Sequence, residues 1–127
     1  MNTIGVGVLG CGNISDIYLS NLTTVFPYVH VEAVCDLDTA KAKAQAAKYG
    51  IKKVLTLDQM LADDAIQIVL NLTTPKAHYS TTKMCLEAGK NVHSEKPLAL
   101  NYQDAAELCT IAESKGLLLG CAPDTFY

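Results

Sequence analysis

The chain has 127 residues, half of them hydrophobic and 18% of them charged, so it can bury the core of one domain and is too apolar to be disordered. The net charge is -3, and the 10 basic residues, all of them lysines, form no cluster of the kind that binds nucleic-acid phosphates. Composition and charge therefore predict a compact protein without a nucleic-acid partner.

The five cysteines are odd in number and none belongs to a Cys-x-x-Cys pair, so the sequence indicates neither a disulfide framework nor a zinc site. No apolar run approaches the length of a membrane span, and no lysine precedes Lys41, which disfavours a signal peptide. We expect a cytoplasmic protein with reduced, buried cysteines, no metal and no membrane contact.

Short apolar runs alternate with segments of helical period, which is the pattern of stacked βαβ units. The first half predicts, in chain order, a strand at Ile4–Leu9, a glycine turn, a helix from Asn13, a strand at Val29–Cys35 and a helix at Thr39–Tyr49 between Asp38 and Gly50. It continues with a short strand at Val54–Leu55, a short helix at Leu57–Leu61 and a buried central strand at Ile66–Leu72.

The second half repeats the alternation. It predicts a helix at Lys76–Glu87 stopped by Gly89, a strand at Asn91–His93, a helix from the Asn101 cap to about Lys115, and a sixth strand at Leu117–Cys121. The fold class is therefore α/β: a doubly wound parallel sheet in three layers, the Rossmann dinucleotide-binding arrangement. We expect residues 1–127 to form this one domain, with no second domain in the chain.

Two glycine registers compete for the phosphate-binding turn. A literal Gly-x-Gly-x-x-Gly match runs from Gly5 to Gly10, but it would put the turn inside the first strand. The register Gly10, Gly12 and Ser15 leaves that strand complete and directs the first N–H groups of a helix at a pyrophosphate. Such a turn alone is also compatible with an ordinary loop. The predicted cofactor contacts in this register are Gly10, Gly12, Asn13 and Ile14.

An acidic residue is expected about 20 residues beyond such a turn, and Asp36 occupies that position after the second strand. Its carboxylate can accept hydrogen bonds from the adenosine ribose, although a solvated turn residue would also fit. A carboxylate about 4 Å from a 2′-phosphate costs on the order of 4 kcal/mol, roughly three decades of affinity. With Asp38 nearby and no arginine, the sequence predicts NAD, and Lys41 is the one nearby cation that could favour NADP.

Four segments form a set that spans nearly the whole chain: Gly10–Ser15, Thr73–Pro75 with His78, Ala88–His93 and Glu95–Ala99. Together they resemble the N-terminal domain of the Gfo/Idh/MocA oxidoreductases, the family of glucose-fructose oxidoreductase and inositol dehydrogenase. The resemblance implies an NAD-dependent enzyme that transfers a hydride to or from a sugar or polyol. It also implies a C-terminal substrate domain, absent from this chain, that supplies a histidine, and a homo-oligomer when full length.

Within this resemblance Lys96 is the predicted catalytic residue, placed beside the nicotinamide, where its ammonium can bind the substrate hydroxyl. The strand-end threonines lie where doubly wound folds bind ligands. His78 is implied to lie near the cofactor, although a helical histidine is as often a core or surface residue. Pro123 and Asp124 replace an asparagine and an arginine of many members. The further cofactor-binding residues implied are Thr73, Thr74, Pro75, His78, Glu95 and Lys96.

Two alternative functions share the features seen in this sequence. One is a cofactor-sensing or scaffold module that performs no chemistry, and the other is a different Rossmann dehydrogenase, such as a relative of biliverdin reductase. A gene that continues into a second domain with a histidine would favour the enzyme over the sensor. On its own, the 127-residue chain is expected to bind NAD without turning over substrate.

Overall fold

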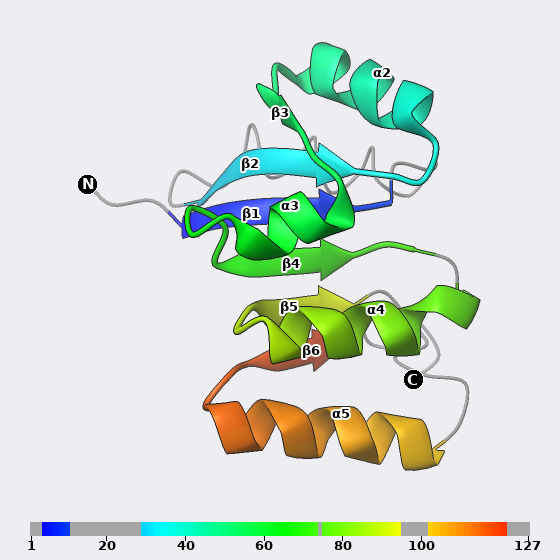
Figure 1. Ribbon diagram of the computed structural model, residues 1–127, viewed down its shortest axis with the longest axis vertical. Coiled ribbons are helices and arrows are strands. Elements are labelled where there is room, and N and C mark those ends of the chain that lie inside the picture. Colours follow the sequence, from blue (N-terminus) through cyan, green and yellow to red (C-terminus); the bar gives the residue numbers. More distant parts are fainter. Residues whose placement is uncertain (1–3, 11–28, 74, 95–101, 122–127) are drawn as a thin grey trace, which may run out of the picture.

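The computed structural model describes residues 4–10, 29–73, 75–94 and 102–121 (Figure 1). Within these residues, parallel strands form one sheet of six in the order β3-β2-β1-β4-β5-β6. This order is that of a doubly wound Rossmann fold, so the predicted fold class is confirmed. The strands are β1 (Ile4–Leu9), β2 (Val29–Cys35), β3 (Lys53–Val54), β4 (Ile68–Asn71), β5 (Asn91–Ser94) and β6 (Leu119–Cys121).

The helices of the described residues are α2 (Thr39–Tyr49), α3 (Leu57–Ala62), α4 (Pro75–Glu87) and α5 (Tyr102–Lys115). The caps explain why α2 has the predicted bounds. The Asp38 carboxylate accepts the N–H of Ala40, and Gly50 ends the helix at a φ of 70°, in the left-handed region. The predicted helix from Asn13 lies outside the described residues.

Four predicted strands differ from the observed ones by one or two residues, and β5 extends one residue beyond the prediction, to Ser94. Ile66 lies before β4 because its N–H donates to Asp63 in a turn, and Leu117 lies before β6 because its N–H donates to Ala112 at the end of α5. The short strand β3 is Lys53–Val54 instead of Val54–Leu55, although Leu55 still donates to the carbonyl of Val34. At β4 and β6 the apolar run extends beyond the residues that pair as a strand.

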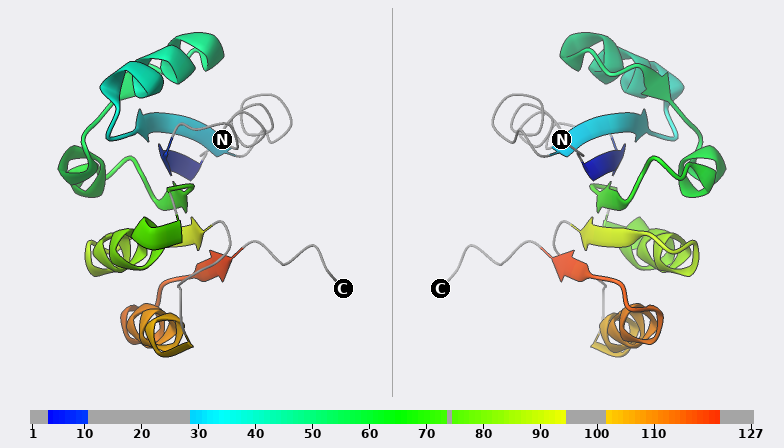
Figure 2. Two further views of the ribbon diagram at one scale, coloured as in Figure 1. Left: turned by 90° about the vertical axis from the view of Figure 1, so that its right-hand side faces the viewer. Right: turned by 90° about the vertical axis from the view of Figure 1, so that its left-hand side faces the viewer.

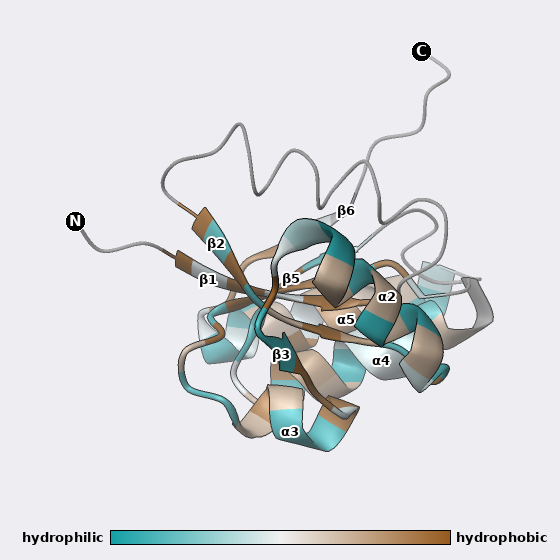
Figure 3. Cartoon of the chain, turned by 90° about the horizontal axis from the view of Figure 1, so that it is seen from above, coloured by the Kyte–Doolittle hydropathy of each residue, from teal (hydrophilic) through white to brown (hydrophobic). Residues whose placement is uncertain are grey.

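The sheet is the middle of three layers, with a separate apolar cluster on each face. Val6, Val8 and Val34 pack with Ala42 and Ala46 of α2 in one cluster. The other cluster joins the opposite face to α3, α4 and α5, which lie on one side of the strands in both views of Figure 2. Figure 3 accordingly shows the strands as mainly hydrophobic and the helices as mixed. Because the strands are parallel, the carboxyl ends of β1, β2 and β4 lie at a common edge of the sheet.

Two glycines of β1 let the strand pack closely against α3 and the segment that precedes β4. A Cβ at Gly5 would lie 1.8 Å from the carbonyl oxygen of Ala65, and one at Gly7 would lie 2.9 Å from the sulfur of Met60. Both residues lie inside the strand, so the literal glycine match starting at Gly5 is a packing feature. This supports the register that begins at Gly10.

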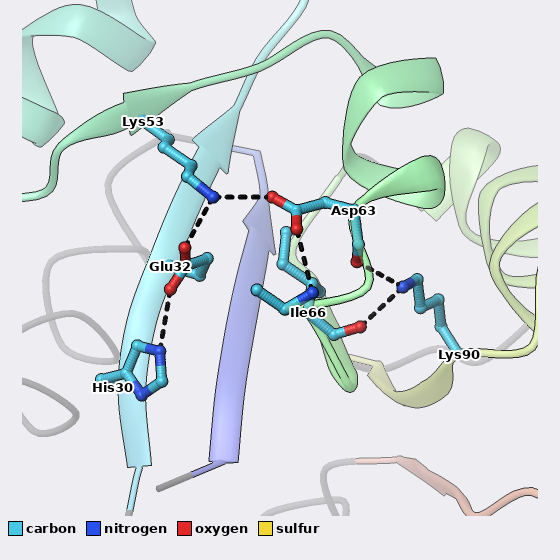
Figure 4. Close-up of polar contacts among 7 residues, drawn as sticks. His30, Glu32, Lys53, Asp63, Ile66 and Lys90 are labelled. Atoms are coloured by element: carbon cyan, nitrogen blue, oxygen red, sulfur yellow. Dashed lines mark hydrogen bonds and ion pairs between the residues drawn. The ribbon is translucent and has the colours of Figure 1, made fainter.

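Ion pairs and a buried ammonium fix the turn between α3 and β4 (Figure 4). Lys53 lies 2.6 Å from a Glu32 oxygen and 3.0 Å from an Asp63 oxygen, and these hydrogen bonds lower the pKa of both carboxyl groups. Lys90, which is 6% exposed, donates to the carbonyl oxygens of Asp63 at 2.7 Å and Ile66 at 2.6 Å. The amino ends of β4 and β5 are therefore held by structural charges.

No helix among the described residues is both long and apolar enough to cross a membrane.

The contact at Gly5 gives a stability prediction. Gly5→Ala should lower the free energy of unfolding by about 3 kcal/mol or more, because the added methyl overlaps a backbone oxygen that cannot move away cheaply. Gly50→Ala is the matched control: its Cβ would meet nothing within 4 Å, and the left-handed φ alone should cost about 1–2 kcal/mol. Urea denaturation measures both, and an equal or smaller loss for Gly5→Ala would contradict the packing.

Candidate functional site

A cleft of about 340 Å³ lies at the edge of the sheet where β1, β2 and β4 end. This volume falls within the range of about 300–1,000 Å³ typical of small-molecule sites. The chain order of the strands reverses between β1 and β4, and doubly wound folds bind ligands in the crevice beyond such a point. Its lining includes Gly10, Asp36, Leu37, Lys41, Thr73 and Thr81.

Gly10 lines this cleft at the end of β1, the strand between β2 and β4. Its φ is 94°, and its N–H donates to the carbonyl oxygen of Cys35 at 2.8 Å. A Cβ here would lie 2.6 Å from the carbonyl oxygen of Leu72. Only glycine allows both this φ and this approach of the backbone that follows β4. The predicted turn glycine therefore brings three strand ends together.

Two carboxylates follow β2 at the start of α2. Oδ1 of Asp36 accepts the N–H of Asp38 at 2.8 Å, and Oδ1 of Asp38 accepts the N–H of Ala40 at 3.0 Å. Asp36 is half-buried in the cleft wall, whereas Asp38 is exposed. Backbone hydrogen bonding thus holds the Asp36 carboxylate at the cleft, where it can accept ligand hydroxyls.

Leu37, between the two aspartates, is fully exposed and lines the cleft, so it offers apolar surface to a ligand. Lys41 lies in the first turn of α2 and lines the same cleft. Burial, followed by the Asp36 charge, raises the pKa of the Cys35 thiol. A neutral thiol at this position is a packing group and a poor nucleophile.

On the other side of Gly10, Thr73 follows β4 and is held by Asn71, which is fully buried. Both the N–H of Thr73, at 3.2 Å, and its hydroxyl, at 2.5 Å, lie against Oδ1 of Asn71. The Asn71 Nδ2 group donates to the hydroxyl of Thr82 at 2.8 Å and to the carbonyl of His78 at 3.3 Å. The amide therefore uses both its donors and its acceptor in one buried network.

His78 lies behind the cleft and is 1% exposed. Its Nε2 lies 2.6 Å from the carbonyl oxygen of Thr73, and because a carbonyl only accepts, Nε2 carries the proton. Two sides of helix α4 contact the site. Ala77 and Thr81 line the cleft, while the carbonyl of His78 and the hydroxyl of Thr82 accept hydrogen bonds from Asn71. His78 thus contacts the site through Thr73 and does not itself line the cleft.

The structure brings together three of the predicted site residues, Gly10, Asp36 and Thr73, around one cleft. Pro75 is the first residue of α4. In the described part of the chain, no group of three or more His, Cys, Asp or Glu side chains could hold a metal ion. The other predicted residues lie outside the described residues: Gly12, Asn13, Ile14, Thr74, Glu95 and Lys96, and with them Ser15, Pro123 and Asp124.

Sequence analysis missed three residues of the site: Leu37, Asn71 and Thr81. The run Ile66–Leu72 contains two polar residues, Gln67 and Asn71, so the sequence pattern alone does not single out Asn71. Thr81 follows Ala77 by four residues, the spacing of one helix face. An exposed leucine between two aspartates carries no sequence signal of a binding surface.

A family model described as "Oxidoreductase family, NAD-binding Rossmann fold" matches residues 4–122. Among curated proteins, the D-glucoside 3-dehydrogenase of Escherichia coli is 32% identical over 90% of this chain and 33% of its own length. The scyllo-inositol 2-dehydrogenase (NADP(+)) IolW of Bacillus subtilis is 29% identical over 94% of this chain and 33% of its own length.

A crystal structure of GenD2 from gentamicin A biosynthesis in complex with NAD has a TM-score of 0.91 and 31% identity, and covers 96% of this chain and 35% of that chain. The 127 residues thus span about a third of the length of these relatives. The matched third is the Rossmann part, and it is similar both to a protein with NAD bound and to one named for NADP.

Proposed function

Because the chain belongs to the Gfo/Idh/MocA family of oxidoreductases as an NAD-binding Rossmann domain, we propose that its protein transfers a hydride between NAD and a sugar or polyol. The observation that supports this most is the cleft beyond β1, β2 and β4, with Gly10 and Asp36 in its wall. Its residues fit a dinucleotide: a left-handed glycine for close backbone approach and a carboxylate for a sugar diol.

The strand order suggests how the cofactor lies. Since β1 stands between β2 and β4, Gly10 lies between Asp36 on one side and Thr73 on the other. A dinucleotide has the same sequence of groups, with a ribose on each side of a pyrophosphate. We place the adenosine ribose at Asp36, the adenine against Leu37, the pyrophosphate at Gly10, Gly12, Asn13 and Ile14, and the nicotinamide half toward Thr73, Thr74 and Pro75.

When bound, the nicotinamide ring supplies the hydride chemistry. We propose that Lys96 lies beside that ring with Glu95, and that its ammonium donates a hydrogen bond to the substrate hydroxyl and polarises it. The relatives are named for inositol and glucoside substrates, which supports a cyclic polyol or sugar here. The substrate-binding part, with a further histidine, belongs outside these 127 residues, because the relatives are about three times as long.

The protein's assembly and location are also proposals. We expect a homo-oligomer when a substrate domain is present, and sedimentation of such a protein would test this. A cytoplasmic location accords with three cysteines of the described residues that form no disulfide: Cys35 and Cys85, which are buried, and Cys109, which is exposed. A thiol count in protein isolated under alkylating conditions tests it, and quantitative disulfide formation would contradict it.

The first prediction about cofactor binding concerns the choice between NADH and NADPH. Calorimetric titration of the 127-residue chain should give an affinity for NADH about 100 to 1,000 times that for NADPH, because Asp36 repels a 2′-phosphate. Asp36→Ala should reduce this ratio to below about ten and weaken NADH binding by roughly tenfold or more, through loss of charged hydrogen bonds. Asp38→Asn is the matched control, since it removes an equal charge and keeps the helix cap. Tighter binding of NADPH by the unmodified chain would refute the proposal.

The second prediction concerns the adenine. Leu37→Ser should weaken AMP binding by about three- to fivefold, because part of a leucine surface leaves the contact, while the free energy of unfolding changes by less than about 0.5 kcal/mol. Leu118→Ser is the control, because Leu118 is also exposed but does not line the cleft. If both variants bind AMP equally, adenine does not lie on Leu37.

The third prediction concerns Lys96. An ammonium beside the nicotinamide repels its oxidised, cationic form, so Lys96→Met should raise the ratio of NAD⁺ to NADH affinity by about tenfold or more. Lys96→Arg should keep the original ratio, and Lys115→Met, at the end of α5, is the charge-matched control. An unchanged ratio in Lys96→Met would place this lysine away from the ring.

A further inference from the structure

The hydroxyl of Thr73 has a fixed direction as a hydrogen-bond donor. Oδ1 of Asn71 accepts from the Thr73 N–H at 3.2 Å and faces the Thr73 hydroxyl at 2.5 Å. An amide oxygen has no proton, so the hydroxyl must be the donor in the second contact. A threonine hydroxyl carries one proton and two lone pairs, and here the proton is directed at Asn71. Only acceptor capacity is left for a ligand in the cleft.

The orientation of the Asn71 amide is itself fixed. Its nitrogen faces the carbonyl oxygen of His78 and the hydroxyl of Thr82, while its oxygen faces the backbone N–H of Thr73. Exchanging the two amide atoms would bring two donors together at Thr73 and two acceptors together at His78. Because Asn71 and Thr82 are fully buried, water cannot relieve such a mismatch.

His78 fixes the remaining polar group of Thr73. Its protonated Nε2 donates to the Thr73 carbonyl at 2.6 Å, and the ring is buried against the sheet. With its N–H, hydroxyl and carbonyl all bonded within the protein, Thr73 can neither rotate its peptide nor turn its hydroxyl without breaking a partly buried hydrogen bond. Asn71 and His78, which lie behind the cleft, thus hold Thr73, the described residue that lines the cleft just after β4.

We propose that Asn71 and His78 are positioning residues that make Thr73 an obligate hydrogen-bond acceptor, selecting an O–H or N–H donor on the nicotinamide half of the cofactor. The inference rests on the proposed function, because it needs a dinucleotide that extends past Gly10 to Thr73. Two groups of that half have the required chemistry: the hydroxyls of its ribose and the N–H group of its carboxamide.

Calorimetric titration of the 127-residue chain with NADH and two of its fragments, ADP and ADP-ribose, tests the proposal. Thr73→Val, which keeps the shape and removes the hydroxyl, should weaken NADH binding by about fivefold, which is about 1 kcal/mol, and leave ADP binding within twofold. Thr73→Ser should restore NADH binding. An equal loss for ADP-ribose would identify a ribose hydroxyl as the donor, and a loss confined to NADH would identify the carboxamide.

The positioning role is tested by the ratio of NADH to ADP affinity. His78→Phe should lower this ratio by about fivefold, and His78→Gln, whose amide can donate to the Thr73 carbonyl, should recover most of it. A residue that only supports folding would change both affinities together. If His78→Phe does not fold, the pair Thr73→Val and Thr73→Ser decides.

Two results separate the inference from the proposed function. If Thr73→Val binds NADH as the unmodified chain does, or loses ADP affinity equally, the acceptor role is wrong while the dinucleotide site stands. If the unmodified chain binds neither ADP nor NADH, the proposed function itself fails.

Discussion

The close approach of three strand ends at Gly10 is the constraint on which the site depends. The Gly10 N–H donates to the carbonyl of Cys35 at the end of β2, while its α-carbon faces the carbonyl of Leu72 after β4. A side chain at this position would separate β4 from β1 and move Asp36 and Thr73 apart. Gly5 and Gly7, earlier in β1, allow a similar close approach, because they let the segment from α3 to β4 pack directly against the strand. Packing on one face of the sheet and recognition at its edge therefore share one cause.

The two ends of the sheet use charge for different purposes. Near the amino ends of β4 and β5, Lys53 forms ion pairs with Glu32 and Asp63 (Figure 4). Lys90 donates to the backbone carbonyl oxygens of Asp63 and Ile66, so these charges are bonded within the protein. At the carboxyl edge of the sheet, the Asp36 carboxylate accepts a hydrogen bond from a backbone N–H and lies in the wall of the cleft. A charge with a fixed position in an accessible cleft can interact with a ligand, whereas a charge inside an ion-pair network mainly supports the fold.

Sequence patterns predicted the fold because its main signals are local. The bounds of α2 follow from an aspartate cap and a terminal glycine, both of which act within one helical turn. The limits of β4 and β6 were predicted less well, because pairing with neighbouring strands decides where a strand ends, and hydrophobicity continues into the adjoining turns. Gly10, Asp36 and Thr73 could be assigned because parallel strands carry their following residues to one edge. Leu37 and Asn71 required knowledge of exposure and of hydrogen-bond partners, which a linear pattern does not contain.

The chemistry of the cleft also limits what it can bind. Asp36 offers a carboxylate on one side of Gly10, and Thr73 offers a hydroxyl oxygen whose proton is already used on the other. A ligand that spans the cleft therefore needs donors at both ends and must tolerate a close backbone in the middle. Two hydroxyl-rich sugars joined through a phosphate bridge meet that requirement, whereas a ligand that ends in a carboxylate or phosphate near Asp36 would be repelled. In the proposed dinucleotide site, selectivity comes from two oriented oxygens, one held by a backbone N–H at Asp36 and one by the buried Asn71 amide at Thr73, without any arginine in the sequence.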